Sequence, residues 1–194
     1  MSDTKIRFAQ PEDAETVHRL VVELAVYEKL SHEVVSTPED IRRALAGPKP
    51  IIDIFLAEIS GNPVGFALFF QTFSTFVGRP GIYLEDLFVL PEYRRRGIAM
   101  ALFHELFRIA RERDCGRLEW SVLDWNEPAI KFYTEKLGAK ILREWWRCRV
   151  ELTPSAPDFA PSSQTPDFAP SPDTREAVSG RSGTSLNEGK HDDP

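Results

Sequence analysis

The sequence lacks the features of a disulfide scaffold, a metal centre or a membrane protein. Its 194 residues include only two cysteines, Cys115 and Cys148, which form no metal-ligand pattern, and its four histidines show no ligand spacing. No apolar run approaches the roughly 18 residues that a membrane-spanning helix needs. The first ten residues, MSDTKIRFAQ, do not resemble a signal peptide. We therefore expect a cytoplasmic protein with reduced thiols, no metal and no membrane association.

An excess of negative charge disfavours nucleic acid as a partner. Lys and Arg number 24 against 30 Asp and Glu, which gives a formal net charge of −6. The field of such a protein repels polyanions. Hydrophobic residues make up 42% of the chain, which is enough for a sizeable core, and the length suits one domain with an appendage.

The composition changes after Leu152. Residues 153–194 hold seven of the 15 prolines, seven acidic residues, three basic residues and the near-repeat APDFAPS and TPDFAPS. Such a segment has too little apolar surface to offset its ordering entropy. We predict a folded domain over residues 1–152 and a disordered, acidic, Pro/Ser-rich tail over 153–194. Phe159 and Phe168 are either partner anchors or parts of a low-complexity extension.

Hydrophobic periodicity predicts a mixed α/β domain. Strands are expected at 5–8, 51–59, 64–72, 82–90 and 117–123, with a last strand in which Trp146, Cys148, Val150 and Leu152 share one face. Helices are expected after Pro11, near Thr37, from Ile98 and over 127–137, where Asn126 is the candidate N-cap and Gly138 the stop. Consecutive strands followed by helix-separated strands indicate a mixed sheet, antiparallel in its first half and parallel in its second.

The segment from Tyr83 to Phe107 carries the most chemical information. It reads as a strand, a turn with three consecutive arginines and Gly97, and a helix. A turn of this kind directs backbone N–H groups and the positive helix end toward one point, which suits a diphosphate. The plainer alternative is a solvated basic turn. The segment contains neither a Walker A loop nor a GxGxxG motif.

Two motifs in this half of the chain resemble those of the GNAT acetyltransferases. RRRGIA at 94–99 resembles the family's Arg/Gln-x-x-Gly-x-Gly/Ala signature, and NEPAIKFY at 126–133 resembles its Asn-x-x-Ala-x-x-Phe-Tyr helix. The resemblance covers about residues 4–152. The segments ELAVYE, YLED and LDWNEP are most similar to diamine acetyltransferases, especially those acting on thialysine. The resemblance implies the GNAT acyl-CoA N-acyltransferase fold and an enzyme that moves the acetyl group of acetyl-CoA directly to a primary amine, without metal.

The same resemblance implies roles for individual residues. Tyr133 is the expected acid for the departing sulfur, Glu85 is the expected base, and Tyr27, Glu28 and Asp86 are expected to bind the amine. The residues implied to hold acetyl-CoA are Leu87, Phe88, Val89, Arg94, Arg95, Arg96, Gly97, Ile98, Ala99, Met100, Asn126 and Tyr133. Glu144, with Trp145 or Trp146, is implied to reach the site of a neighbouring subunit, so a homodimer is expected.

Several of these roles have structural alternatives. Glu85 and Asp86 are consecutive on a predicted strand, so their side chains are expected on opposite faces and at most one faces the site directly. Tyr133 can instead serve as a packing aromatic, and Tyr27 and Glu28 can simply end a helix. An alkyl amine has a pKa of about 10.4 and is mostly protonated at neutral pH, so it must lose a proton before it can attack the thioester. Carboxylates can both attract the charged amine and accept that proton.

The chain also departs from the family pattern in three places. In the turn at 94–99, Arg95, Arg96 and Ala99 stand where other members are richer in glycine. The loop at 71–78 lacks the acidic residue and the tryptophan of polyamine-acetylating members, which favours thialysine, a lysine-like molecule or a short diamine over spermidine and spermine. Between Tyr133 and Gly138 there is one residue more than expected. Other functions left open are acetylation of protein lysines or of aminoglycosides, and a non-catalytic CoA-binding regulatory module.

Overall fold

The computed structural model describes residues 4–150. By its contacts the chain divides into two units, Met1–Ile141 and Leu142–Pro194. The first unit holds every helix and strand assigned within the described residues. The expected tail at 153–194, with Phe159 and Phe168, lies outside the described residues, and the boundary at Leu152 therefore stays a prediction.

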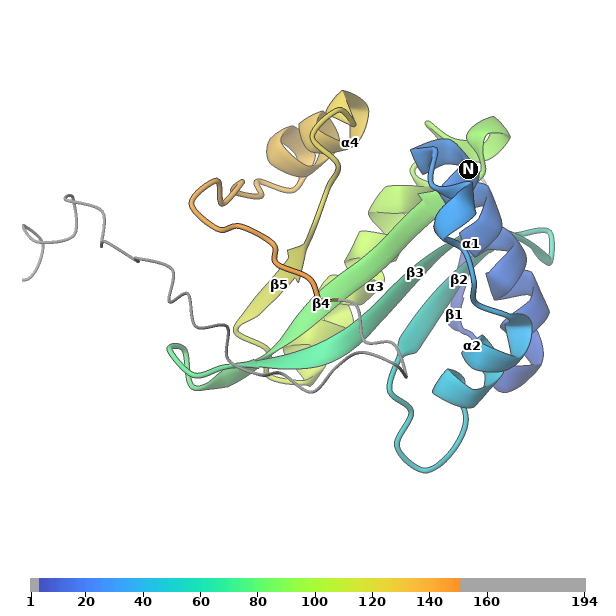
Figure 1. The fold of residues 1–194 in the computed structure, drawn as a ribbon, viewed down its shortest axis with the longest axis horizontal. Helices are drawn as coiled ribbons and strands as arrows, with labels where there is room; N and C mark the ends of the chain where they lie inside the picture. Colours follow the sequence, from blue (N-terminus) through green and yellow to red (C-terminus); the bar gives the residue numbers. More distant parts are fainter. Residues whose placement is uncertain (1–3, 151–194) are drawn as a thin grey trace, which may run out of the picture. The chain divides into compact units, whose positions relative to one another are not determined.

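The order of elements follows the predicted order up to residue 136 (Figure 1). The strands are β1 (Thr4–Phe8), β2 (Asp53–Ile59), β3 (Asn62–Ser74), β4 (Arg79–Val89) and β5 (Arg117–Trp120). The α-helices are α1 (Ala14–Glu28), α2 (Pro38–Leu45), α3 (Ile98–Glu112) and α4 (Glu127–Lys131). Helix α4 continues as a π-helical segment, η4 (Phe132–Lys136), and short 3-10 turns span Pro11–Asp13, Ser31–Glu33 and Pro91–Tyr93.

The strands form one mixed sheet in the order β1-β2-β3-β4-β5. Neighbours are antiparallel from β1 to β4, whereas β4 and β5 are parallel. This arrangement confirms the predicted antiparallel first half and parallel second half. The β2–β3 connection is tighter than predicted, because Ser60 and Gly61, with φ of 51° and 79°, make a two-residue turn and β3 already begins at Asn62.

Helices cover both faces of this sheet. Val17, Leu20 and Leu24 of α1 and Ile41 of α2 are buried with Phe66 and Phe88 in one cluster. On the other face, buried residues of α3 join a second cluster; they include Leu102, Phe103 and Leu106. The amphipathic faces predicted for α1 and α3 are therefore confirmed as facing the core.

The predicted last strand is wrong over the described part of its range. No strand is assigned to residues 142–150, and Trp145, Trp146 and Val150 are exposed. Alternating side chains are a local pattern, whereas a strand also needs a neighbouring strand with which its backbone can pair. The described residues of the second unit show this alternation but pair with no neighbouring strand.

Candidate active site

Strand β4 extends well beyond its pairing with β5. The parallel ladder joins Gly81 to Arg117 and ends where Leu84 meets Trp120, although β4 continues to Val89. Figure 1 shows the chain after β5 leaving the side of β4 and running to α4. Within residues 4–150, no strand pairs with this edge of β4 beyond Leu84. An unpaired strand edge can bind the amide groups of an extended ligand, as the prediction for Leu87, Phe88 and Val89 requires.

A β-bulge lies at the start of this unpaired stretch. Consecutive residues of β3, Leu68 and Phe69, pair with Asp86 and Leu84, which leaves Glu85 as the extra residue of β4. The bulge reverses the side-chain alternation, because Leu84 packs in the α3-side cluster and Phe88 in the α1-side cluster.

The bulge overturns the expectation that Glu85 and Asp86 lie on opposite faces. Asp86 pairs with Leu68, which packs on the α1 side of the sheet, and Leu84 pairs with Phe69, which is buried on the α3 side. Glu85 follows Leu84 and so turns to the face opposite it, which is also the α1 side. Both carboxylates are therefore on one face, with Asp86 partly buried and Glu85 exposed.

Asp86 and Glu28 belong to an acidic cluster at this face, together with Glu85. Burial, and then the charges of Glu85 and Glu28, raise the pKa of Asp86 to about 7. Burial also raises the pKa of Glu28. A cluster of this kind attracts an ammonium group strongly, and its most buried carboxyl can exchange a proton near neutral pH.

Tyr133 lies beside the same cluster. Burial, and then the nearby Glu28 and Tyr27, raise its pKa to about 12, so the phenol keeps its proton at neutral pH. Its ring makes edge contacts with Phe103 and Trp120, with centroids 5.9 and 5.2 Å apart. The ring is therefore packed while the phenol stays protonated beside the carboxylates, so packing and the expected acid role do not exclude each other.

The π-helical segment η4 spans most of the stretch from Tyr133 to Gly138, where one extra residue is expected. A π turn accommodates one more residue than an α turn. In η4 the Thr134 hydroxyl donates to the Ile130 carbonyl at 2.9 Å, and the backbone N–H of Ala139 donates to the Tyr133 carbonyl at 3.0 Å. A turn of this width has room for such a residue, and Gly138, with φ of 68°, follows the end of the helix as predicted.

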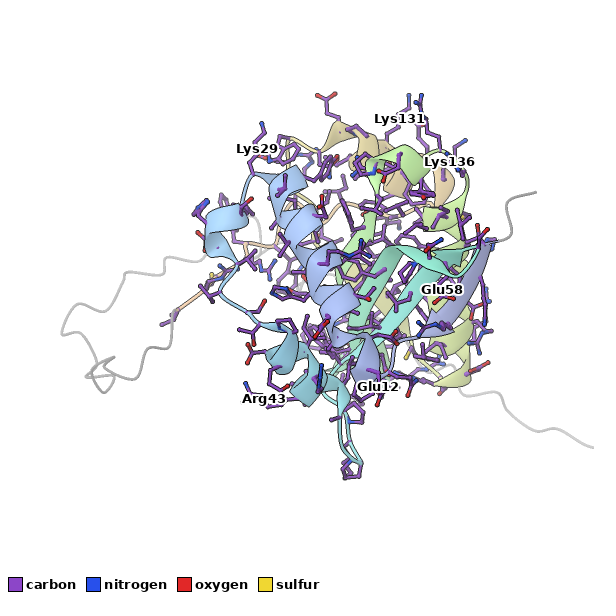
Figure 2. The ribbon with its side chains drawn as sticks, turned by 90° about the vertical axis from the view of Figure 1, so that its right-hand side faces the viewer. Glu12, Lys29, Arg43, Glu58, Lys131 and Lys136 are labelled. Atoms are coloured by element: carbon purple, nitrogen blue, oxygen red, sulfur yellow. The ribbon has the colours of Figure 1, made fainter. Side chains whose placement is uncertain are left out.

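Tyr27 and Asn126 connect α1 to the start of α4. The Tyr27 hydroxyl donates to Asn126 Oδ1 at 3.2 Å, and the same oxygen accepts the backbone N–H of Ala129 at 3.4 Å. Asn126 is thus the predicted N-cap, and its side chain is buried in this role. Trp125, which the sequence did not single out, packs on Tyr27 with centroids 6.2 Å apart. Figure 2 shows that the C-terminal end of α1, marked by Lys29, lies at the same end of the first unit as α4, marked by Lys131. Glu12 and Arg43 lie at the opposite end.

The turn before α3 has the geometry of an anion site. Arg95 and Gly97 both have positive φ, 60° and 83°, and Gly97 precedes the first residue of a 15-residue helix. The first backbone N–H groups of that helix, at Ile98, Ala99 and Met100, have no acceptor within the helix. Apart from its two neighbours in the chain, no residue lies within 4 Å of where a Gly97 side chain would begin, so a ligand can approach the main chain there. These residues fit a diphosphate.

The three arginines of the turn are placed differently. Arg95 and Arg96 are exposed, and Arg96 donates to the Glu92 carbonyl at 3.0 Å. Arg94 is partly buried and contacts the end of β4 and the Tyr27 ring. Glu144, expected at a neighbouring subunit's site, is exposed in the second unit.

Two kinds of feature are missing from the part of the chain that the structure describes. No helix within 4–150 combines the length and the apolar character needed to span a bilayer. In the same residues, no three Cys, His, Asp or Glu side chains gather as ligands for a metal ion.

Comparison with known proteins identifies the family. The model of the acetyltransferase (GNAT) family matches residues 19–139. The chain belongs to the GNAT family. It is 36% identical to the thialysine N-epsilon-acetyltransferase of Mus musculus, over 78% of this chain and 94% of that protein. It is 30% identical to the L-ornithine N5-acetyltransferase NATA1 of Arabidopsis thaliana, over 76% and 84%.

Solved structures agree with this GNAT assignment. An integron cassette protein from V. cholerae superposes with a TM-score of 0.63 at 26% identity, over 78% of this chain and 93% of that one. An aminoglycoside acetyltransferase from a soil metagenome, at 17% identity with a TM-score of 0.65, shares the fold. The protein is therefore an N-acetyltransferase with the GNAT fold, as its motifs at 94–99 and 126–133 predicted.

Proposed function

We propose that this GNAT enzyme transfers the acetyl group of acetyl-CoA to a primary amine of a small molecule, either thialysine, a lysine-like amino acid or a short diamine. The observation that carries the proposal is the acidic cluster of Glu28, Glu85 and Asp86 beside the buried Tyr133. A site with clustered carboxylates and a protonated phenol suits an ammonium substrate and a thiolate leaving group. The relatives named for thialysine and ornithine support this substrate class.

The chemistry assigned to these side chains balances without a further reactant. The acidic cluster draws in the ammonium, and one of its carboxylates, Asp86 directly or Glu85 through water, accepts a proton from it. The nitrogen forms the new bond to the acetyl carbon while the bond from carbon to sulfur breaks. Tyr133 donates its proton to the departing sulfur, and the second proton that the acylated nitrogen releases restores the phenol, while the carboxyl passes the first proton to the solvent. The thioester supplies the activated acyl group.

The residues proposed to hold acetyl-CoA belong to β4, to the turn before α3 and to the start of α4. The unpaired edge of β4 at Leu87, Phe88 and Val89 would bind the amide groups of the pantetheine arm. The turn from Arg95 to Met100 would bind the diphosphate through its backbone N–H groups and its exposed arginines. Asn126, already engaged by Tyr27 and Ala129, would border the arm where it reaches Tyr133.

The loop between β3 and β4 supports a short substrate. Its tip, residues 75–78, carries no acidic side chain, and Phe76 there is 96% exposed. Each distal ammonium of a polyamine needs its own counter-charge. We therefore propose that spermidine and spermine are poorer substrates than thialysine or ornithine. We also propose a homodimer in which Glu144 contacts the neighbouring site.

The test is a measurement of thiol release from acetyl-CoA with a panel of amines. The panel contains thialysine, ornithine, lysine, putrescine, spermidine, an aminoglycoside and a lysine-containing peptide, and mass spectrometry identifies the acetylated product. We expect Tyr133→Phe to lower kcat by about 10²-fold or more, while calorimetry shows retained CoA binding. Tyr83→Phe is the matched control, since the Tyr83 hydroxyl bonds to Ser121 rather than to the acidic cluster. CoA binding without turnover of any amine would instead indicate a regulatory module.

A further inference from the structure

Arg94 turns away from its two arginine neighbours. Its Nε donates to the Val89 carbonyl at 2.9 Å, and its guanidinium carbon lies 4.3 Å from the centre of the Tyr27 ring and 5.5 Å from that of Phe88. The side chain is therefore fixed against the end of β4 and the last turn of α1. Arg95 is exposed on the same turn, and Arg96 is exposed as well, although it donates to the Glu92 carbonyl and lies over the Tyr93 ring.

Tyr27 passes this contact on to the helix that carries Tyr133. Its hydroxyl donates to Asn126 Oδ1, the atom that also caps the first turn of α4. A continuous chain of contacts thus runs from Val89 through Arg94, Tyr27 and Asn126 to α4. This chain of contacts connects the end of β4 to the start of α4, beyond the point where β4 and β5 cease to pair. Within residues 4–150, no strand pairing joins these two segments.

We propose that Arg94 is a positioning residue, which fixes Tyr27 and Asn126 and thereby the start of the Tyr133 helix, and that it does not bind the phosphates of the cofactor. Only the expected change in kcat rests on the proposed acetyl transfer. The geometry favours arginine specifically, because a planar guanidinium can stack on a ring and donate from Nε at the same time. A lysine keeps the charge but cannot make both contacts.

The test compares two acetyl donors in variants of the same turn. Acetyl-CoA carries the phosphates, whereas S-acetylpantetheine carries the same thioester without them. For Arg94→Gln and Arg94→Lys we expect kcat to fall about tenfold with both donors, and the ratio of their kcat/KM values to stay within about twofold of the parent. That loss corresponds to about 1.4 kcal/mol. Arg95→Ala is the matched control, for which the ratio should shift against acetyl-CoA.

Two measurements read out the inference without turnover. Calorimetry should give a Kd for CoA within about twofold of the parent for Arg94→Gln, but a clearly weaker Kd for Arg95→Ala. In urea unfolding, Arg94→Gln combined with Tyr27→Leu should destabilise less than the two single changes together, since each already removes the shared contact.

Opposite results would overturn the positioning role. These are CoA binding weakened tenfold or more by Arg94→Gln but restored by Arg94→Lys, or unfolding effects of the Arg94 and Tyr27 changes that simply add. If the parent acetylates no amine, the proposed function fails, while calorimetry and the unfolding cycle still decide the role of Arg94.

Discussion

Replacing Asp86 with Asn should stabilise the protein, and the gain should depend on pH. Burial, followed by the charges of Glu85 and Glu28, raises the Asp86 pKa from 3.8 to about 7 in the folded chain. In the unfolded chain the carboxyl returns to its ordinary value. Between these two values the folded protein therefore holds a proton that the unfolded protein has released.

The sign and size of the effect follow from proton linkage. Because the folded state binds more protons, the free energy of unfolding contributed by Asp86 falls as pH rises from about 4 to about 7. A shift of about three pKa units corresponds to about 4 kcal/mol, and this cost is fully present above pH 7. Asn carries no charge at any pH and removes the cost. We expect Asp86→Asn to match the parent near pH 4 and to gain up to about 4 kcal/mol at pH 8.

Urea unfolding of the parent and the variant from pH 4 to pH 8 measures this difference directly. At pH 8 the gain should raise the melting temperature by about 10 °C, at a few degrees for each kcal/mol. Glu23→Gln is a suitable control, because Glu23 is an exposed carboxylate on α1, the same helix as Glu28. A stability difference between Asp86→Asn and the parent that stays flat with pH would refute the burial of this carboxyl beside other negative charges.

Three further predictions concern activity and the helix that carries Tyr133. In the parent, kcat/KM should rise through about pH 7 as Asp86 ionises. The Asp86→Asn variant should lose that rise, and the Glu85→Gln variant should keep it. The reverse pattern would make Glu85 the base. Thr134→Val should lower the free energy of unfolding by about 1 kcal/mol in urea, since it loses the bond to the Ile130 carbonyl, whereas Thr134→Ser should not. A chain that ends after Leu152 should keep its rate of thiol release, and a collapse would show that the tail takes part.

Local signals predicted the framework well. The apolar spacing of α1 and α3, the Asn126 cap and the Gly138 stop depend on neighbouring residues only, and the structure confirms all four. The mixed sheet followed from the order of strands and helices, because hairpins make antiparallel neighbours and helical crossovers make parallel ones.

The features that the sequence did not reveal needed information from beyond the local pattern. The alternation from Trp146 to Val150 is typical of a strand, but pairing requires a partner that alternation does not specify. Arg94 was expected with its neighbours at the phosphates because all three share one motif. Its stacking on Tyr27, 67 positions earlier in the chain, is a tertiary contact that no motif records.

Two local irregularities lie in the candidate site, and each breaks the periodicity of a regular strand or helix. The bulge at Glu85 turns two consecutive carboxylates to one face, which alternation forbids in a regular strand. The π turn after Lys131 widens the helix at Tyr133. Asp86 directly follows the bulge and Tyr133 lies in the π turn, and the pKa of each of these two side chains is raised. Departures from regular structure are costly unless the surroundings hold them, so their coincidence with the acidic cluster supports the proposal that this cluster binds the substrate.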